Sequence, residues 1–297
     1  AGMHEKGEMA AHGLRCAMRT TGRDETRLVG SARRTPLTMQ AFARELADIL
    51  LTVDPLGVGL EFAKGEGPII HRPVRGADDV ARLPAIDVAS AVGFVFETVR
   101  LVRRALPAAV PLIGFAGAPF TVASYLVEGG PSRDFTATKR LMHELPEAWA
   151  RLMALLASAT ATYLNGQIAA GAQAVQLFDS WVGALSPDDY REFVLPHTRA
   201  VVRALTPGVP VIHFGTGTAG LLPSMRQAGG DVIGLDWRVD LDAGWRAVGE
   251  DVAVQGNLDP AALLSPPARF AAGVRAILDR ARGRPGHIFN PGHGILP

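Results

Sequence analysis

Short apolar runs recur from residue 110 onward, and amphipathic stretches separate several of them. The runs are rich in Val, Ile and Phe and end in Gly, Asp, Ser or Asn, residues typical of the turns between strands and helices. Apolar runs separated by helices indicate parallel strands that are buried on both faces. The pattern predicts strands at "VPLIGFAG" (110–117), "AVQLFDS" (174–180), "VPVIHFG" (209–215), "VIGLDW" (232–237), "VAVQGNL" (252–258) and "GHIFNPG" (286–292).

One of the intervening helices can be predicted together with its cap. In "SPDDYREFVLPHTRAVVRAL" (186–205), Ser186 is placed to cap the helix, Pro187 takes the first helical position and Asp189 the third. Apolar positions then repeat with helical spacing and predict one apolar face: Phe193, Val194, Thr198, Val201 and Val202. A helix between two predicted strands completes a parallel βαβ unit.

The alternation of strands and helices favours a (β/α)8 TIM-type barrel that forms a single domain over residues 1–297. A dinucleotide-binding fold has less support, because "GTGTAG" (215–220) fits its glycine fingerprint only loosely and comes late in the chain. In such barrels the chemistry lies where the strands end. At or near these ends the sequence places Phe115, Ser180, His213, Asp236, Asn257 and His293.

Composition restricts the compartment and the partners. Hydrophobic residues make up 48% of the chain, and 30 Lys and Arg against 29 Asp and Glu give a net charge of +1. This balance argues against a general nucleic-acid or membrane surface. The single cysteine, Cys16, excludes an internal disulfide and a multi-cysteine metal site, which fits a reducing cytosol. With no apolar run of about eighteen residues and no signal-like start, we expect a soluble cytoplasmic protein.

Five long blocks resemble the uroporphyrinogen decarboxylase family, in the family's order. The match begins near residue 46 and continues to the end of the chain. The resemblance implies a (β/α)8 barrel, a homodimer whose active-site clefts face one another, and an enzyme without metal or organic cofactor. Its activity would remove carbon dioxide from the four acetate side chains of uroporphyrinogen III, giving coproporphyrinogen III in haem biosynthesis. The blocks are "GFAGAPFTVASYLVEGG" (114–130), "QLFDSWVGALSPDDYREFVLP" (176–196), "VIGLDWRVDL" (232–241), "VQGNLDP" (254–260) and "GHIFNPGHGI" (286–295).

The residue types needed for this reaction can be stated independently. Loss of carbon dioxide from an acetate leaves a carbanion, and a pyrrole protonated on a ring carbon can accept its electrons. A carboxylate near the pyrrole nitrogens would stabilise the positive charge that develops there. The protein also needs cations or hydrogen-bond donors for eight substrate carboxylates, and apolar walls for the macrocycle.

The resemblance assigns two residues to catalysis. Asp48, in "ELADILL" (45–51), stands where the family has its essential aspartate, although by itself it would be interpreted as a solvated aspartate on a helix. Tyr125 matches the family's active-site tyrosine, and the alternative is a core tyrosine whose hydroxyl is bonded.

Three further residues are assigned to substrate binding by the same resemblance. Phe115 would form part of the apolar wall, Ser180 would contact the substrate, and His293 would reach a substrate carboxylate. Taken alone, Phe115 would be a core residue, Ser180 a turn residue and His293 a structural histidine.

The first part of the chain follows the family less closely. "MRTTGRDETR" (18–27) keeps the spacing of the family's Met-Arg-Gln-Ala-Gly-Arg motif, so Arg19 and Arg23 are assigned to substrate carboxylates. The segment between Arg23 and Asp48 is shorter than in the family, and residues 1–45 are atypical. The family also continues beyond Pro297 into a closing helix. We therefore expect a barrel that is incomplete in its first units and its last helix, with strand edges exposed.

Two other functions stay open at this point. A corrinoid-related methyltransferase of the same superfamily would need zinc ligands, and His213 stands at the tempting position for one. However, Gly215 follows two residues later and the one cysteine, Cys16, is near the N-terminus. The other possibility is a non-catalytic relative that binds porphyrinogens, which the altered arginine motif favours.

Overall fold

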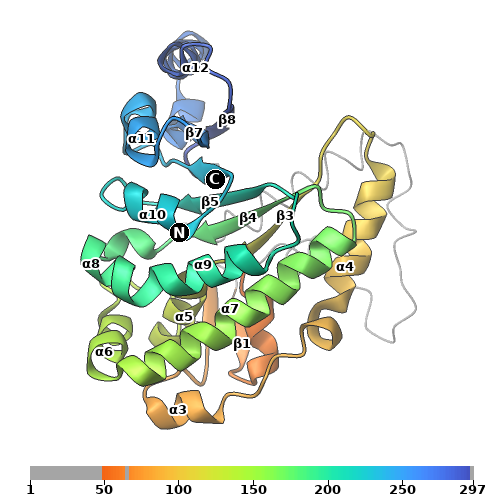
Figure 1. Cartoon of the computed structure of the whole chain (residues 1–297), viewed down its shortest axis with the longest axis vertical. Coiled ribbons are helices and arrows are strands. Elements are labelled where there is room, and N and C mark those ends of the chain that lie inside the picture. The colour runs from red at the N-terminus through yellow and green to blue at the C-terminus, as the bar shows by residue number, and fades with distance from the viewer. Residues whose placement is uncertain (1–48, 64–66, 295–297) are drawn as a thin grey trace.

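The computed structural model describes residues 49–63 and 67–294, and their main feature is a parallel sheet with helices packed on its outer side (Figure 1). Within the described residues, the sheet has six strands in sequential order, β3-β4-β5-β6-β7-β8. All the predicted strands are confirmed, each one to three residues shorter than predicted. The strands are β3 (Ile113–Gly117), β4 (Ala174–Asp179), β5 (Val211–Gly215), β6 (Val232–Gly234), β7 (Ala253–Leu258) and β8 (His287–Pro291).

Helices connect each pair of neighbouring strands. In Figure 1, α4, α7 and α9 lie side by side along one face of the sheet. Strand and helix alternate as in a (β/α)8 barrel, and a sheet of six sequential parallel strands is consistent with an incomplete barrel. The helices are α3 (Ala77–Arg82), α4 (Val88–Ala105), α5 (Pro119–Glu128), α6 (Thr136–Glu144), α7 (Pro146–Ala169), α8 (Pro187–Asp189), α9 (Leu195–Ala204), α10 (Leu222–Ala228), α11 (Leu241–Val248) and α12 (Pro267–Ala281).

A small unit precedes the sheet. The 3-10 helix η2 (Leu51–Leu56) leads into an antiparallel pair, β1 (Leu60–Ala63) and β2 (Gly67–Ile70). Ile49 and Leu50, just before η2, are buried in the main hydrophobic core. The first two described residues are therefore already part of the hydrophobic core.

The helix predicted over 186–205 forms with the predicted cap but changes its geometry part-way. Ser186 Oγ accepts a hydrogen bond from the backbone N–H of Asp189 at 3.1 Å. After α8 the chain makes a wider π turn (Tyr190–Val194) before α9. Pro196 follows that turn, and its missing N–H removes one bond of the regular α-helical ladder.

The outer face of the sheet packs against helices, and the register identifies its residues. Strand neighbours in a parallel sheet share a face, and Leu177, His213, Ile233 and Val254 form one such row. Leu177 belongs to the core shared with Leu164 of α7. The row therefore points outward, and the alternate residues point into the barrel.

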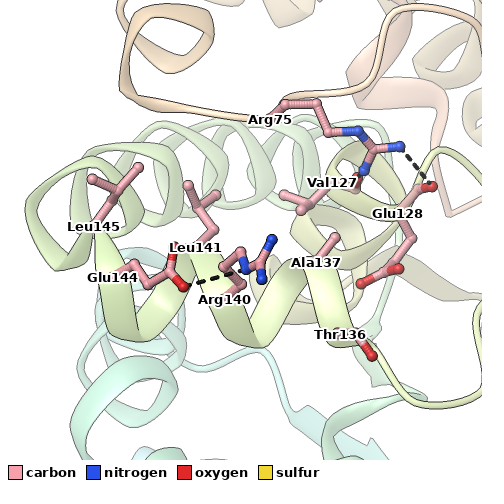
Figure 2. Close-up of a pocket in the computed structure, with 9 residues that line it drawn as sticks. All are labelled: Arg75, Val127, Glu128, Thr136, Ala137, Arg140, Leu141, Glu144 and Leu145. Carbon is pink, nitrogen blue, oxygen red and sulfur yellow. Dashed lines mark hydrogen bonds and ion pairs between the residues drawn. The ribbon is translucent and has the colours of Figure 1, made fainter.

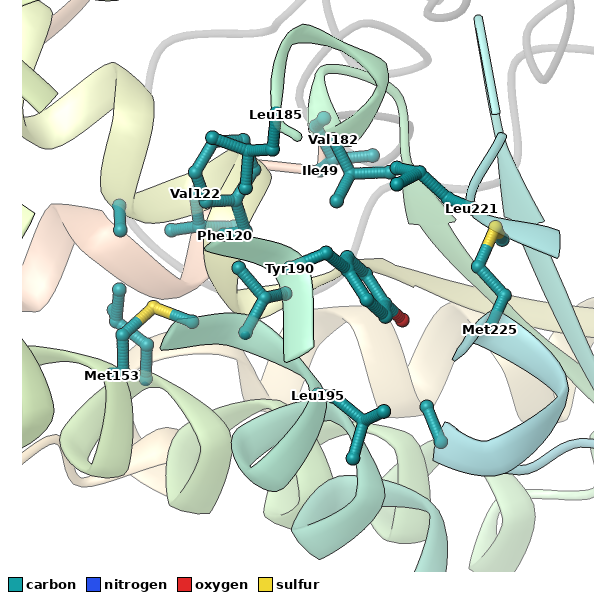
Figure 3. Close-up of a cluster of buried hydrophobic side chains, with 14 of the residues drawn as sticks. Ile49, Phe120, Val122, Met153, Val182, Leu185, Tyr190, Leu195, Leu221 and Met225 are labelled. Carbon is teal, nitrogen blue, oxygen red and sulfur yellow. The ribbon is translucent and has the colours of Figure 1, made fainter. Parts of the chain in front are cut away.

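A second part of the core lies between α5, α7, α9 and α10. Figure 3 shows its side chains around the ring of Tyr190, with Ile49 among them. Tyr190 is fully buried, and burial together with the Asp179 carboxylate raises the pKa of its hydroxyl well above the ordinary value of 10.0. This packing holds the helices against the carboxyl ends of β3, β4 and β5.

A side chain of α7 bonds to the edge of β3 that does not pair with β4. Gln167 of α7 accepts a hydrogen bond from the backbone N–H of Phe115 at 3.0 Å and donates one to its carbonyl at 2.9 Å. N–H and C=O of one residue in a parallel strand face the same side, so both bonds lie on the edge that faces away from β4. Such coverage protects an edge from pairing with another chain.

Candidate active site

Polar side chains gather where the strands end. By strand alternation and register, Ser180, Thr216, Asp236, Asn257 and Asn290 continue the inward-facing rows beyond the apolar interior. The Thr216 hydroxyl donates to the carbonyl of Ser180, which joins the ends of β4 and β5. Asn257 lies opposite Asn290 in the register of β7 and β8. The carboxyl end of the barrel is thus the polar end, as expected for an active site in this fold.

Below this layer the interior wall is aromatic. Phe178 packs edge-to-face on Phe115 and on Phe214, with ring centroids 5.9 Å apart in both pairs. Phe115 therefore lies inside the barrel on β3, as an apolar wall residue would. Such a row of rings provides a surface for a large planar or bowl-shaped ligand.

Tyr125 lies on α5 and stacks on Trp181, the residue directly after Ser180. The two ring centroids are 3.8 Å apart, and Phe135 packs on the same indole at 5.0 Å. Tyr125 is fully buried and Ser180 is 6% exposed. The structure therefore brings Tyr125 and Ser180 to one place, at the ends of β3 and β4.

The exit of β4 is fixed by a buried carboxylate. Asp179 Oδ1 accepts a hydrogen bond from the Thr121 hydroxyl at 2.9 Å, and the same hydroxyl accepts one from the Trp181 backbone N–H at 3.3 Å. Asp179 belongs to the outer face, so it holds the loop that carries Ser180 and does not itself enter the barrel.

A second cluster lies at the ends of β6, β7 and β8. Asp236 Oδ2 accepts from the Gly217 backbone N–H at 2.7 Å and from Arg238 Nη1 at 2.6 Å. The Arg238 guanidinium lies 3.9 Å above the Trp237 ring, and His293 contacts that ring edge-to-face at 5.7 Å. His293 is thus at the polar end of the barrel, on the side of β6 to β8.

His213 does not face the barrel interior, which corrects its placement among the strand-end residues. It belongs to the outward row, between Leu177 and Ile233, and is fully buried. Burial lowers the pKa of the imidazole to about 4, although the carbonyls of Gly229 and Met225 act in the opposite direction. Sequence could not distinguish the two faces of β5, because all its residues are buried.

This burial makes folding stability depend on pH. Folded His213 stays neutral down to a pH of about 4, whereas the unfolded side chain takes up a proton near 6.5. The stabilising contribution of neutral His213 is fully present above pH 6.5. It is lost as the pH falls toward 4, which lowers the free energy of unfolding by about 3 kcal/mol. His213→Leu introduces an apolar side chain like those of its neighbours Leu177 and Ile233. Measured by urea unfolding, the free energy of unfolding of this variant should decrease less than that of the wild type between pH 6.5 and 4. An equal loss in both proteins would contradict this.

One cavity lies away from the strand ends. Its volume is about 590 Å³, and it opens between the end of α5 and α6 (Figure 2). Its polar residues are engaged within the chain: Arg140 pairs with Glu144 at 3.3 Å, and Arg75 donates to the carbonyl of Glu128. The Glu128 carboxylate also accepts from the N–H and hydroxyl of Thr138, both at 2.8 Å, and so caps α6.

Comparison with known proteins agrees with these features. A model of the family described as "Uroporphyrinogen decarboxylase (URO-D)" matches residues 42–297. The chain belongs to the uroporphyrinogen decarboxylase family. Uroporphyrinogen decarboxylase of Sorangium cellulosum is 58% identical over 252 residues, which cover 84% of this chain and 72% of that protein. The enzyme of Carboxydothermus hydrogenoformans is 54% identical over 250 residues, covering 84% and 71%.

A solved structure supports the fold from a greater distance. A methyltransferase from Methanosarcina mazei matches with a TM-score of 0.74 and 18% sequence identity, covering 99% of this chain and 82% of that one. At this identity the likeness concerns the fold alone.

Three of the residues that the family resemblance assigns, Asp48, Arg19 and Arg23, lie outside the described residues. Ile49, which follows Asp48, is described, and its backbone lies against Gly117 at the carboxyl end of β3. The other four fall into two places: Phe115, Tyr125 and Ser180 near β3 and β4, and His293 near β6 and β8.

Sequence reasoning missed Arg238 and the two tryptophans on which the site residues pack. Trp181 stacks on Tyr125, and Trp237 contacts both Arg238 and His293. The available signal was "LDWRVD", where an arginine follows a strand-end aspartate by two residues.

Proposed function

We propose that this chain removes carbon dioxide from the four acetate side chains of uroporphyrinogen III and yields coproporphyrinogen III. Membership of the uroporphyrinogen decarboxylase family carries this proposal, since relatives named for that activity are 50–58% identical. The aromatic interior around Phe178 and the polar strand ends fit a macrocycle with carboxylate arms.

Each assigned residue would have a role that follows from the chemistry of its side chain. Asp48 supplies the carboxylate near the pyrrole nitrogens, where it stabilises positive charge as the protonated pyrrole accepts electrons. Tyr125 and Ser180 contact the substrate from the β3–β4 side, and His293 binds a carboxylate from the β6–β8 side. The proposal for Tyr125 and Ser180 is supported by the contact of Tyr125 with Trp181, the residue that follows Ser180.

Arg19 and Arg23 would hold further carboxylates, because a guanidinium binds them bidentately and stays charged. The reaction would need no metal and no organic cofactor, which rests on the resemblance to the family. Within residues 49–63 and 67–294, no three His, Cys, Asp or Glu side chains are grouped as metal ligands would be.

Assembly and location are also proposals. A homodimer is implied by the family, and the cytoplasm fits the single cysteine. No helix in the described part of the chain is long and apolar enough to cross a membrane. The near-neutral net charge of +1 supports a small-molecule partner and no nucleic acid.

A methyltransferase activity has less support. The likeness to the Methanosarcina mazei protein concerns the fold, and His213 points outward into a helix interface. His213 is therefore not placed to bind zinc in the barrel interior, and a zinc ligand there would have to be another residue.

The test is an anaerobic incubation of the purified chain with uroporphyrinogen III, with products separated by their number of carboxyl groups. We expect coproporphyrinogen III to accumulate equally with and without a metal chelator. Binding without any product would favour the non-catalytic relative. Loss of activity on chelation that zinc restores would contradict the cofactor-free proposal.

A further inference from the structure

Arg238 is held in place at the end of β6 while half of its side chain stays open to solvent. Its side chain is 51% exposed, whereas its partner Asp236 is 1% exposed. Nη1 donates to Asp236 Oδ2 at 2.6 Å, and the guanidinium carbon lies over the Trp237 ring, 3.9 Å from its centroid. An exposed arginine normally loses much rotamer freedom on binding a ligand. Here two contacts have already fixed it, so that loss is smaller.

The Asp236 carboxylate does not depend on the guanidinium alone. Its Oδ2 also accepts from the Gly217 N–H at 2.7 Å, and its Oδ1 accepts from the Arg238 backbone N–H at 3.1 Å. Of the side-chain nitrogens of Arg238, only Nη1 donates to a residue in the described part of the chain. The edge formed by Nε and Nη2 presents two parallel N–H groups, the geometry that binds a carboxylate bidentately.

Arg238 also lies beside a residue already assigned to substrate. Trp237 carries the guanidinium on its face at 3.9 Å and contacts His293 at 5.7 Å. Two groups that can bind anions therefore contact the same indole, at the polar end of the barrel. A macrocycle whose carboxylate arms are spaced around its rim could engage both at once.

We infer that Arg238 binds a carboxylate arm of the tetrapyrrole substrate, next to the arm held by His293. The inference rests on the proposed function and adds one residue to its binding surface. Asp236 and Trp237 are then positioning residues, since they aim the guanidinium. The competing role is purely structural, in which Arg238 only fastens the β6–α11 loop to Asp236.

The experiment compares the steady-state kinetics of Arg238→Gln and of a matched control with uroporphyrinogen III under anaerobic conditions. We expect KM to rise about tenfold in Arg238→Gln, more than kcat falls, since a charge-assisted bidentate contact is lost. The difference in KM between Arg238→Gln and the wild type should become smaller at high salt, because salt screens an ionic contact. Arg246→Gln is the control, since Arg246 is an exposed arginine that pairs with Asp242 on α11 at 2.9 Å.

A KM in Arg238→Gln within about twofold of the wild type, or an equal rise in Arg246→Gln, would overturn the inference. If Arg238→Gln fails to fold, Arg238→Lys is the variant to measure. Lysine keeps the positive charge but lacks the planar guanidinium that binds a carboxylate bidentately. The KM of Arg238→Lys should then lie above the wild-type value, and an unchanged KM would overturn the inference. A wild-type chain without turnover would instead contradict the proposed function itself.

Discussion

Gly292→Ala should destabilise the protein by roughly 2–3 kcal/mol and reduce turnover by about a hundredfold. A Cβ at this position would lie 2.4 Å from the backbone nitrogen of Trp237 and 2.8 Å from the carbonyl carbon of Asp236. Both are main-chain atoms, so the loop after β8 must move away from the end of β6. Because His293 is the next residue, it would leave its place against Trp237.

Gly220→Ala is the matched control for this prediction. Gly220 follows β5 at the same end of the barrel, and a Cβ there meets nothing within 4 Å. Urea unfolding and anaerobic turnover should be close to wild type in this variant. If Gly292→Ala has the same stability and turnover as Gly220→Ala, the loop after β8 does not lie as close to the end of β6 as described.

Asp48→Asn should lower kcat by a hundredfold or more, on the order of the loss from removing one electrostatic group in other enzymes. The amide keeps the shape of the side chain and removes the charge that would stabilise a protonated pyrrole. KM should change much less, because other groups hold the substrate carboxylates. Steady-state kinetics under anaerobic conditions would measure both values.

Asp54→Asn is a suitable comparison, since Asp54 lies in η2 six residues later and is exposed. It should keep full activity. Full turnover in Asp48→Asn would show that this carboxylate is not the catalytic one. Low turnover in both variants would indicate a general effect on this segment.

The strands could be predicted because parallel strands buried on both faces give continuous apolar runs. The same property hid which residues point inward. On β5, Val211, His213 and Gly215 face helices while Ile212 and Phe214 face the barrel, yet all of them are buried. Only the register against neighbouring strands reveals the difference, so His213 was wrongly placed among the strand-end residues.

The site was predictable where a residue's position follows from the end of a strand. Ser180 lies directly after β4, and His293 lies two residues after β8. Arg238 could not be predicted, because its orientation depends on contacts that cross from one loop to another. Its guanidinium is fixed by Asp236 and Trp237, and the same carboxylate binds Gly217 of the preceding loop.

The central claim is that this chain decarboxylates the acetate arms of uroporphyrinogen III. It is tested most directly by following substrate labelled with carbon-13 in the acetate carboxyl groups, under anaerobic conditions. Counting the labelled carbon dioxide gives the number of arms processed. We predict four labelled molecules released for each macrocycle converted, and none when only the propionate carboxyl groups carry the label. Release of no labelled carbon dioxide from the acetate-labelled substrate would contradict the claim.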